Sequence, residues 1–327
     1  MIISKTPYRI SFFGGGSDYP EWHKKNEGKV LSTTINKYLY ISCRFLPNFF
    51  KHKYRIVWSK VENVKNINQI NHKAIREILH YLKIKRGLEI HYDGDLPSRS
   101  GMGSSSSFVV GLLKALYRIN NYNLTKYELA KKSIFIEQKI LKEVVGSQDQ
   151  VSASHGGFNK IIFKKNLINV KPIKYNQNIK KLDNNLILIF TGLQRTAHAI
   201  ANKYVKKLNT SKKYNINKIL SYVTEGEKIL KTGEIDDFGK LLNEAWMEKK
   251  KLSNAITNKK IDELYNHAIN YGALGGKVLG AGGGGFLLLY MKKNSRKKFF
   301  QKIKNFIHVP FSFTSEGSKI IFDDLER

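Results

Sequence analysis

The chain has 327 residues and carries 57 lysine and arginine residues against 26 aspartate and glutamate residues, so its formal net charge is +31. A single cysteine, Cys43, excludes a disulfide scaffold or a thiolate metal site, and 41% hydrophobic and 12% aromatic residues exclude a disordered chain. Because no apolar stretch suits a membrane span or a secretion signal, we expect a globular, cytoplasmic protein with Cys43 buried.

The excess of positive charge would attract nucleic acid, anionic lipid or phosphorylated small molecules. Only ten of the basic residues are arginine, and the lysines are spread through segments rich in asparagine and isoleucine. Surfaces that bind nucleic acid usually concentrate arginine and aromatic residues in a stripe, and the sequence has no such stripe. We therefore favour a general bias of composition, and a basic nucleic-acid-binding protein stays open as an alternative.

The first half of the chain mixes strand and helix patterns. Runs rich in β-branched and aromatic residues predict strands, and apolar residues at helical spacing predict helices. The strands are expected at 1–13, 37–45, 53–58, 87–93, 157–163 and 167–171, and the helices at 72–83, 104–119 and 125–145. A stretch rich in lysine and asparagine at about 174–185 predicts a connection or a poorly packed edge. We place a first domain at 1–175.

The second half opens with an apolar strand at 185–192 and continues with helical patterns from about 196 to 271. It ends with the strand GFLLLYM, a helix near 295–305 and two terminal strands. Strands segregated around a block of helices are typical of the α+β class. We therefore predict an α+β protein with two domains, the second at 176–327.

The segment PSRSGMGSSSSFVV (97–110) places glycines and serines at the start of the predicted helix 104–119. Gly101 and Gly103 permit a close approach of the backbone, and the serine hydroxyls add to the free amide donors of the first helical turn. An ordinary helix cap needs only one serine, and the patterns of a Walker A loop and of a nucleophile elbow are absent. The segment predicts a phosphate-binding loop.

Two carboxylates follow this loop. Glu137 lies within the apolar stripe of the predicted helix 125–145, where it is either part of a structural ion pair or a metal ligand. Asp149 lies among small polar residues and is either a solvated turn residue or a proton acceptor. Phosphoryl transfer needs a magnesium ligand and often a carboxylate that accepts the proton of the acceptor hydroxyl. The two residues can supply both functions.

A second glycine cluster, KVLGAGGGGF, formally matches a dinucleotide-binding pattern. A strand follows it rather than a helix, and no acidic residue lies about 20 positions further on, so the match fails in its context. The cluster is either a flexible loop between strands or a glycine surface that contacts another loop or a ligand.

Together, the segments PYRISFFGGGSDYP, LPSRSGMGSSSS and KVLGAGGGGF resemble the three motifs of the GHMP kinase superfamily in order and separation. The resemblance implies an N-terminal domain with a left-handed β-α-β unit and a C-terminal ferredoxin-like domain. It also implies that ATP, Mg²⁺ and the acceptor bind between the two domains. The number of subunits is left open.

The resemblance implies roles for single residues. Asp149 is the implied catalytic base, and Arg9 the residue that stabilises the deprotonated acceptor. Ser104 and Glu137 are the implied magnesium ligands. The implied contacts to the phosphates of ATP are Gly101, Gly103, Ser104, Ser105 and Ser106, and the implied contacts to the acceptor are Gly15, Gly16, Ser17, Asp18 and Gly283.

The first motif of this chain differs from that of galactokinases, and the difference indicates which sugar is the acceptor. Galactokinases have Gly-Glu-His-Thr-Asp-Tyr where this chain has GGGSDY, so two side chains that contact galactose are missing. The glycine version resembles the branch that phosphorylates the anomeric hydroxyl of D-glycero-D-manno-heptose 7-phosphate or of L-fucose. The chain length is similar to that of the heptose enzymes, which implies the 7-phosphate as acceptor and L-fucose as the alternative. A phosphorylated acceptor needs a cation, for which we expect Arg195 or Arg99. A surface ion pair is the alternative for Arg195, and a contact to the phosphates of ATP is the alternative for Arg99.

Overall fold

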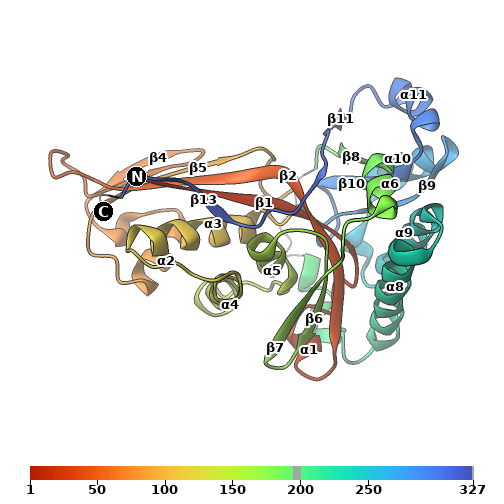
Figure 1. Cartoon of the computed structure of the whole chain (residues 1–327), viewed down its shortest axis with the longest axis horizontal. Helices are drawn as coiled ribbons and strands as arrows, with labels where there is room; N and C mark the ends of the chain where they lie inside the picture. The colour runs from red at the N-terminus through yellow and green to blue at the C-terminus, as the bar shows by residue number, and fades with distance from the viewer. Residues whose placement is uncertain (194–199, 326–327) are drawn as a thin grey trace.

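The computed structural model describes residues 1–193 and 200–325, and the strands in these residues form two sheets, one of nine strands and one of four. Figure 1 shows the large sheet along the length of the molecule and the small sheet at one end, with a pair of long helices beside the junction. None of the helices in this part of the chain is long and apolar enough to cross a membrane. The α+β class predicted from the sequence is confirmed.

The large sheet is built around β1 and β2, two long strands that pair with each other in antiparallel fashion. The other neighbouring strands of this sheet also pair in antiparallel fashion, except for β3 and β5, which are parallel to each other. Its strands are β1 (Ile2–Phe13), β2 (Gly28–Phe45), β3 (Tyr54–Val57), β4 (Val61–Val64), β5 (Leu88–Gly94), β6 (Asn159–Lys164), β7 (Leu167–Pro172), β12 (Phe313–Thr314) and β13 (Lys319–Asp323).

Helices cover one face of this sheet (Figure 1). The helix α3 packs closely on β1 and β2, and because most of its side chains are buried, it forms the centre of this layer. The helical elements of this half are α1 (Pro20–His23), η1 (Ile67–Gln69), α2 (Lys73–Tyr81), α3 (Ser104–Ile119), α4 (Lys126–Phe135), the π-helical turn η2 (Ile136–Ile140) and α5 (Gln148–His155).

The small sheet is antiparallel and has the strand order β11-β8-β10-β9. Its strands are β8 (Leu186–Phe190), β9 (Ala273–Val278), β10 (Phe286–Met291) and β11 (Ile307–His308). The helical elements of this half are α6 (Gln177–Asn185), η3 (Val205–Lys207), α8 (Lys213–Thr232), α9 (Ile235–Lys250), η4 (Asn254–Ile256), α10 (Lys259–Asn270) and α11 (Lys293–Lys302).

Two local predictions were wrong. The stretch predicted as a connection at 174–185 contains the helix α6, because Asn176 caps its first turn and the helix buries Ile179 and Leu182 against the core. The helix predicted at 125–145 ends earlier, since α4 passes into a π-helical turn that ends at Ile140. Such turns inside helices are frequent at functional sites, and this one carries Glu137.

The C-terminal segment returns to the large sheet. Its strands β12 and β13 pair with β2 and β1, and the backbone of Asp324 exchanges hydrogen bonds with Met1, so the two termini lie together in Figure 1. A division of the chain at residue 175 therefore does not coincide with the division into two sheets, and this boundary stays a prediction.

The two halves share one hydrophobic core. Phe238 of α9 packs against Phe12 and Phe13 of β1, with ring centroids 5.3 and 5.1 Å apart. The Lys277 ammonium group of β9 donates to the backbone oxygens of Ser11 and Phe12, at 2.9 and 2.6 Å. Apolar packing and buried hydrogen bonds thus hold the small sheet against the end of β1.

The two glycine-rich loops also contact each other directly. A Cβ atom at Gly285 would lie 2.1 Å from the backbone oxygen of Ser100, and one at Gly101 would lie 2.5 Å from the oxygen of Leu279. The Phe286 amide donates to the Ser100 oxygen at 3.1 Å. The glycine cluster is therefore a surface that contacts another loop, as one of the two interpretations of its sequence held.

We predict that Gly285→Ala lowers the free energy of unfolding by about 3 kcal/mol, because it adds a clash to a left-handed backbone conformation. The matched control is Gly192→Ala, since Gly192 has a similar φ of +73° but the nearest atom, Lys260 Nζ, is 3.7 Å from its added Cβ. The control should lose only about 1 kcal/mol. Urea unfolding of both variants measures the difference, and equal losses would contradict the close contact of the loops.

Candidate active site

Most residues predicted to act in catalysis or binding line one cavity of about 380 Å³ between the two halves of the molecule. They come from β1 and the loop after it, from the loop before α3, and from the first turn of α5. The predicted residues that line the cavity are Arg9, Gly15, Gly16, Asp18, Arg99, Gly101, Gly103, Ser104, Ser105, Ser106 and Asp149.

Arg9 and Asp149 form a bidentate ion pair at the floor of this cavity. The Arg9 Nε and Nη2 atoms donate to the two carboxylate oxygens of Asp149, each at 2.7 Å, and Nη1 donates to the Gly101 oxygen at 2.7 Å. Arg9 is buried, whereas about a quarter of the Asp149 side chain, 23%, is exposed. The pair therefore presents a carboxylate to the cavity and holds it in a fixed orientation.

Asp18 is buried beside this pair and joins the loop after β1 to the start of α5. Its carboxylate accepts from the amides of Gly16 and Gln148, and its backbone oxygen accepts from the Ser147 amide. Burial, and then the negative charge of Asp149, raise the pKa of Asp18 to about 6. A Cβ atom at Gly146 would lie on the Asp18 carboxylate, so only glycine fits there without displacing Asp18.

The serine loop has the geometry that anion binding requires. Gly103 caps α3 in the left-handed conformation with a φ of +78°, and a Cβ atom there would crowd Asp149 and Arg9. The Ser104 hydroxyl accepts from the Arg99 amide at 3.2 Å, while Ser105 is exposed. The first-turn amides of α3 and the serine hydroxyls thus lie at the cavity, where they can bind phosphate oxygens.

Glu137 lies behind the serine loop and does not line the cavity. It is fully buried, and it accepts from both the Gln150 amide and the Ser106 hydroxyl, the latter at 2.9 and 3.1 Å to its two oxygens. The serine that contacts Glu137 is thus Ser106 and not Ser104. Burial raises the pKa of Glu137 to about 8.

The residues here fit a divalent cation held partly by nucleotide phosphates. No group of three or more His, Cys, Asp or Glu side chains in the described residues could hold a metal ion alone. Among the described side chains, no cation lies within ion-pair distance of Glu137, so a bound metal ion would supply the positive charge that its ionised form lacks. Mg²⁺ is usually bound by one or two carboxylates together with substrate phosphates, which is the donor set that this region offers.

Two of the predicted acceptor-binding residues, Ser17 and Gly283, do not line the cavity. The Ser17 hydroxyl is buried and bonds the backbone of Gly14 and Lys29. Gly283 does not line the cavity, although Gly282 and Gly284 do, and its amide donates to the Ile256 oxygen at 2.7 Å. Arg195 lies outside the described residues.

The cavity also has lining residues that sequence reasoning missed. Gln148, Tyr19 and Tyr204 line it, as does Lys249 of α9, whose ammonium group donates to the Gly280 oxygen at 2.5 Å. Burial, and then the charge of Arg9, lower the pKa of Lys249 to about 8. Lys249 is one of three consecutive lysines, so the sequence pattern does not indicate which of them is buried.

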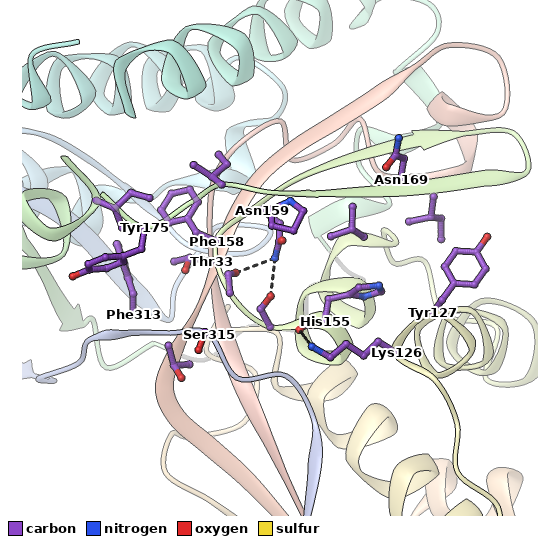
Figure 2. Close-up of a pocket in the computed structure, with 18 residues that line it drawn as sticks. Thr33, Lys126, Tyr127, His155, Phe158, Asn159, Asn169, Tyr175, Phe313 and Ser315 are labelled. Carbon is purple, nitrogen blue, oxygen red and sulfur yellow. Dashed lines mark hydrogen bonds between the residues drawn. The ribbon is translucent and has the colours of Figure 1, made fainter. Parts of the chain in front are cut away.

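A larger hollow of about 860 Å³ lies elsewhere, between the β6–β7 hairpin, the start of α4 and the C-terminal segment. Figure 2 shows Tyr127, Tyr175, Phe158 and Phe313 on its walls. Two of its polar side chains bond backbone oxygens, since Lys126 donates to the His155 oxygen and Asn159 donates to the oxygens of Gly156 and Gly157 in the preceding turn. It contains none of the predicted catalytic residues and is therefore not the candidate active site.

Two protein families match the chain, one in each half. The family described as "GHMP kinases N terminal domain" matches residues 69–157, and the family described as "GHMP kinases C terminal" matches residues 227–308. The chain is 31% identical over 97% of its length, and 98% of the relative, to D-glycero-alpha-D-manno-heptose 7-phosphate kinase of Campylobacter jejuni.

Two further relatives are more distant. The bifunctional fucokinase/GDP-fucose pyrophosphorylase of Arabidopsis thaliana is 25% identical over 85% of this chain, which spans 28% of that longer protein. The crystal structure of a D-glycero-D-manno-heptose 1-phosphate kinase from Bacteroides thetaiotaomicron has a TM-score of 0.80 at 24% identity and covers 99% of this chain and 100% of its own. The motifs, the fold and the matches agree: the chain belongs to the GHMP kinase family and is an ATP-dependent sugar kinase.

Proposed function

We propose that the protein transfers the γ-phosphoryl group of ATP to the anomeric hydroxyl of D-glycero-D-manno-heptose 7-phosphate and so forms the 1,7-bisphosphate. The observation that carries the reaction is the Arg9–Asp149 pair, which faces the same cavity as the serine loop. The observation that carries the substrate is the 31% identity to a heptose 7-phosphate kinase over nearly the whole of both chains.

In this proposal, the serine loop binds the phosphates of ATP, and the acceptor hydroxyl lies against Asp149. The hydroxyl proton passes to the Asp149 carboxylate as the sugar oxygen forms a bond to the γ-phosphorus, and the bond from that phosphorus to the β-phosphate oxygen of ADP breaks. Arg9 orients Asp149 and stabilises negative charge on the acceptor oxygen.

Ser104, Ser106 and Glu137 are the side chains that would hold Mg²⁺ together with the nucleotide phosphates. The ion neutralises negative charge that develops on the phosphates during transfer. Asp18 and the backbone at Gly15 and Gly16 bind the hydroxyls of the sugar. Arg99, exposed on the serine loop, is placed to bind a phosphate of either substrate, and Arg195 stays a prediction.

The direct test is ADP release from purified protein with Mg-ATP and, in turn, D-glycero-D-manno-heptose 7-phosphate, L-fucose, galactose and mevalonate. We expect turnover with the heptose phosphate. L-fucose is the second candidate, because of the similarity to a fucokinase. Turnover with a neutral sugar alone would overturn the proposed substrate, and nucleic-acid binding that weakens steeply with salt, without turnover, would favour the nucleic-acid-binding alternative.

Asp149→Asn should lower kcat at least about 100-fold, because the amide keeps a hydrogen-bond acceptor for Arg9 but cannot accept the proton. Binding of ATP, measured by calorimetry, should be retained. The matched control is Asp237→Asn, which removes an exposed carboxylate paired with Lys240 and should leave kcat unchanged. An unchanged kcat in Asp149→Asn would indicate transfer without a base.

Glu137→Gln should raise the Mg²⁺ concentration needed for half-maximal activity at least about tenfold, because a carboxylate ligand becomes a neutral amide. The fold should survive, since the amide oxygen still accepts from Ser106. Glu128→Gln, at an exposed capping box, is the control that should leave this concentration unchanged. A normal magnesium dependence in Glu137→Gln would leave Glu137 with a structural role only.

The KM for the acceptor should rise as the pH falls through about 6, because the pKa of Asp18 lies there and its neutral form is a weaker acceptor for sugar hydroxyls. The acceptor phosphate titrates in the same range, so the readout is the difference between the wild type and Asp18→Asn. The variant should have a higher KM at pH 8 and a smaller rise on acidification. Parallel profiles would show that Asp18 does not bind the sugar.

A further inference from the structure

A small inner pocket of about 30 Å³ adjoins the cavity and has no part in the phosphoryl transfer proposed above. It shares the residues Arg9, Gly15, Gln148, Lys249 and Gly280 with the large cavity. Its remaining walls come from the end of β1, from α8 and α9, and from β9. The serine loop, residues 99–106, contributes no wall, so a phosphate of ATP held on that loop does not occupy this pocket.

Two lysines give the pocket its charge. Lys277 is only 6% exposed, and its ammonium group donates to the backbone oxygens of Ser11 and Phe12. The Lys249 ammonium group donates to the backbone oxygens of Gly280 and Val278. Each ammonium group has three donors, so each keeps at least one for a ligand. Within residues 1–193 and 200–325, neither lies within ion-pair distance of a carboxylate.

Such an arrangement is unfavourable without an anion. Burial lowers the pKa of both lysines, and repulsion from the nearby charge of Arg9 lowers it further. Buried cations normally have a carboxylate or another anion as partner. Asp149 already binds Arg9 through both of its oxygens. The negative charge of Asp18 favours the charged form of Lys249 from beyond ion-pair distance, so neither lysine has a carboxylate in direct contact within the described residues.

Ser11 provides a second, independent observation. It lies on the wall of the pocket and is 5% exposed, and its hydroxyl has no hydrogen-bond partner within the described residues. A buried hydroxyl without a partner is unfavourable, so such groups usually bind a ligand or an ordered water. Two lysines and a serine whose hydroxyl lacks a partner line one small space, and together they offer donors for an oxyanion.

We propose that this inner pocket, walled by Lys249, Lys277 and Ser11, binds the phosphate that the acceptor sugar already carries. The proposal rests on the proposed function, in which the acceptor is a sugar 7-phosphate. A pocket of this size holds about two water-sized groups, so it takes the outer oxygens of a phosphate while the sugar stays in the large cavity.

The position of Arg9 agrees with this assignment. Its guanidinium group binds Asp149, which faces the large cavity, and Arg9 is also part of the wall of the inner pocket. A sugar whose anomeric hydroxyl contacts Asp149 can therefore extend past Arg9 and place a distal phosphate beside Lys249. The acceptor is then held at both ends, by Asp149 at the reacting hydroxyl and by the lysines at the phosphate.

The test compares D-glycero-D-manno-heptose 7-phosphate with unphosphorylated D-glycero-D-manno-heptose as acceptors, using the ratio of their kcat/KM values. In wild-type protein we expect a strong preference for the phosphorylated sugar. Lys249→Met should reduce this preference at least about tenfold, mainly through a higher KM for the phosphorylated sugar, and Ser11→Ala should reduce it about threefold or more. Thermal unfolding verifies that both variants fold.

Lys250→Met is the matched control, because Lys250 follows Lys249 on α9, pairs with Asp262 and lines neither cavity. It should keep the wild-type ratio. A wild type that prefers the neutral sugar would overturn the proposed substrate and the pocket assignment together. If Lys249→Met and Ser11→Ala both keep the wild-type preference, the pocket assignment alone is overturned. It is also overturned if Lys249→Met lowers kcat equally for both sugars, because Lys249 would then act on the transferred phosphoryl group.

Discussion

The ion pair between Arg9 and Asp149 is the interaction on which the cleft depends. It joins β1 to the first turn of α5, and the third hydrogen bond of the guanidinium group joins both to the serine loop at Gly101. Because Arg9 is buried, the loss of its partner would leave an unpaired charge in the interior, at a cost of about 3–5 kcal/mol. The bond that orients the proposed base is therefore also a bond that stabilises the fold.

The second half of the chain completes this cleft. The glycine cluster after β9 contacts the serine loop so closely that side chains at Gly285 or Gly101 would clash with backbone atoms. Lys277 bonds the end of β1, and Phe238 packs on Phe12 and Phe13. Because both halves support the same loop, the groups proposed to bind phosphate are already in position before a ligand arrives, which lowers the entropic cost of ordering them.

Much of this arrangement was predictable from the sequence. The helix α3 has the bounds that its apolar spacing indicated, and the buried Cys43 lies in a strand of the large sheet as its neighbours suggested. The family resemblance indicated that Arg9, Asp18 and Asp149 belong to one site, and the fold brings them to one cavity. These features depend on local periodicity or on motifs whose spacing is itself the signal.

The parts that were missed depend on contacts between distant segments. Lys277 stands at the start of the glycine cluster in the sequence, and only the position of β9 beside the end of β1 shows that its partners are backbone oxygens. Glu137 was assigned with Ser104, whereas the π-helical turn and the phase of α3 bring Ser106 against it. The helix α6 depends on an asparagine cap in a segment whose composition favours a loop.

Burial also explains which part of the large positive charge is relevant to function. Most lysines resemble Lys259, whose side chain is 91% exposed and whose charge is screened by water and salt. Lys277 has the same chemistry but lies in the interior, where an opposite charge interacts with it far more strongly. An excess of surface lysines therefore attracts many anions weakly, whereas two buried lysines beside Arg9 discriminate among them by size and position. Net charge and specific anion recognition are thus separate properties of this chain, and the sequence displays only the first.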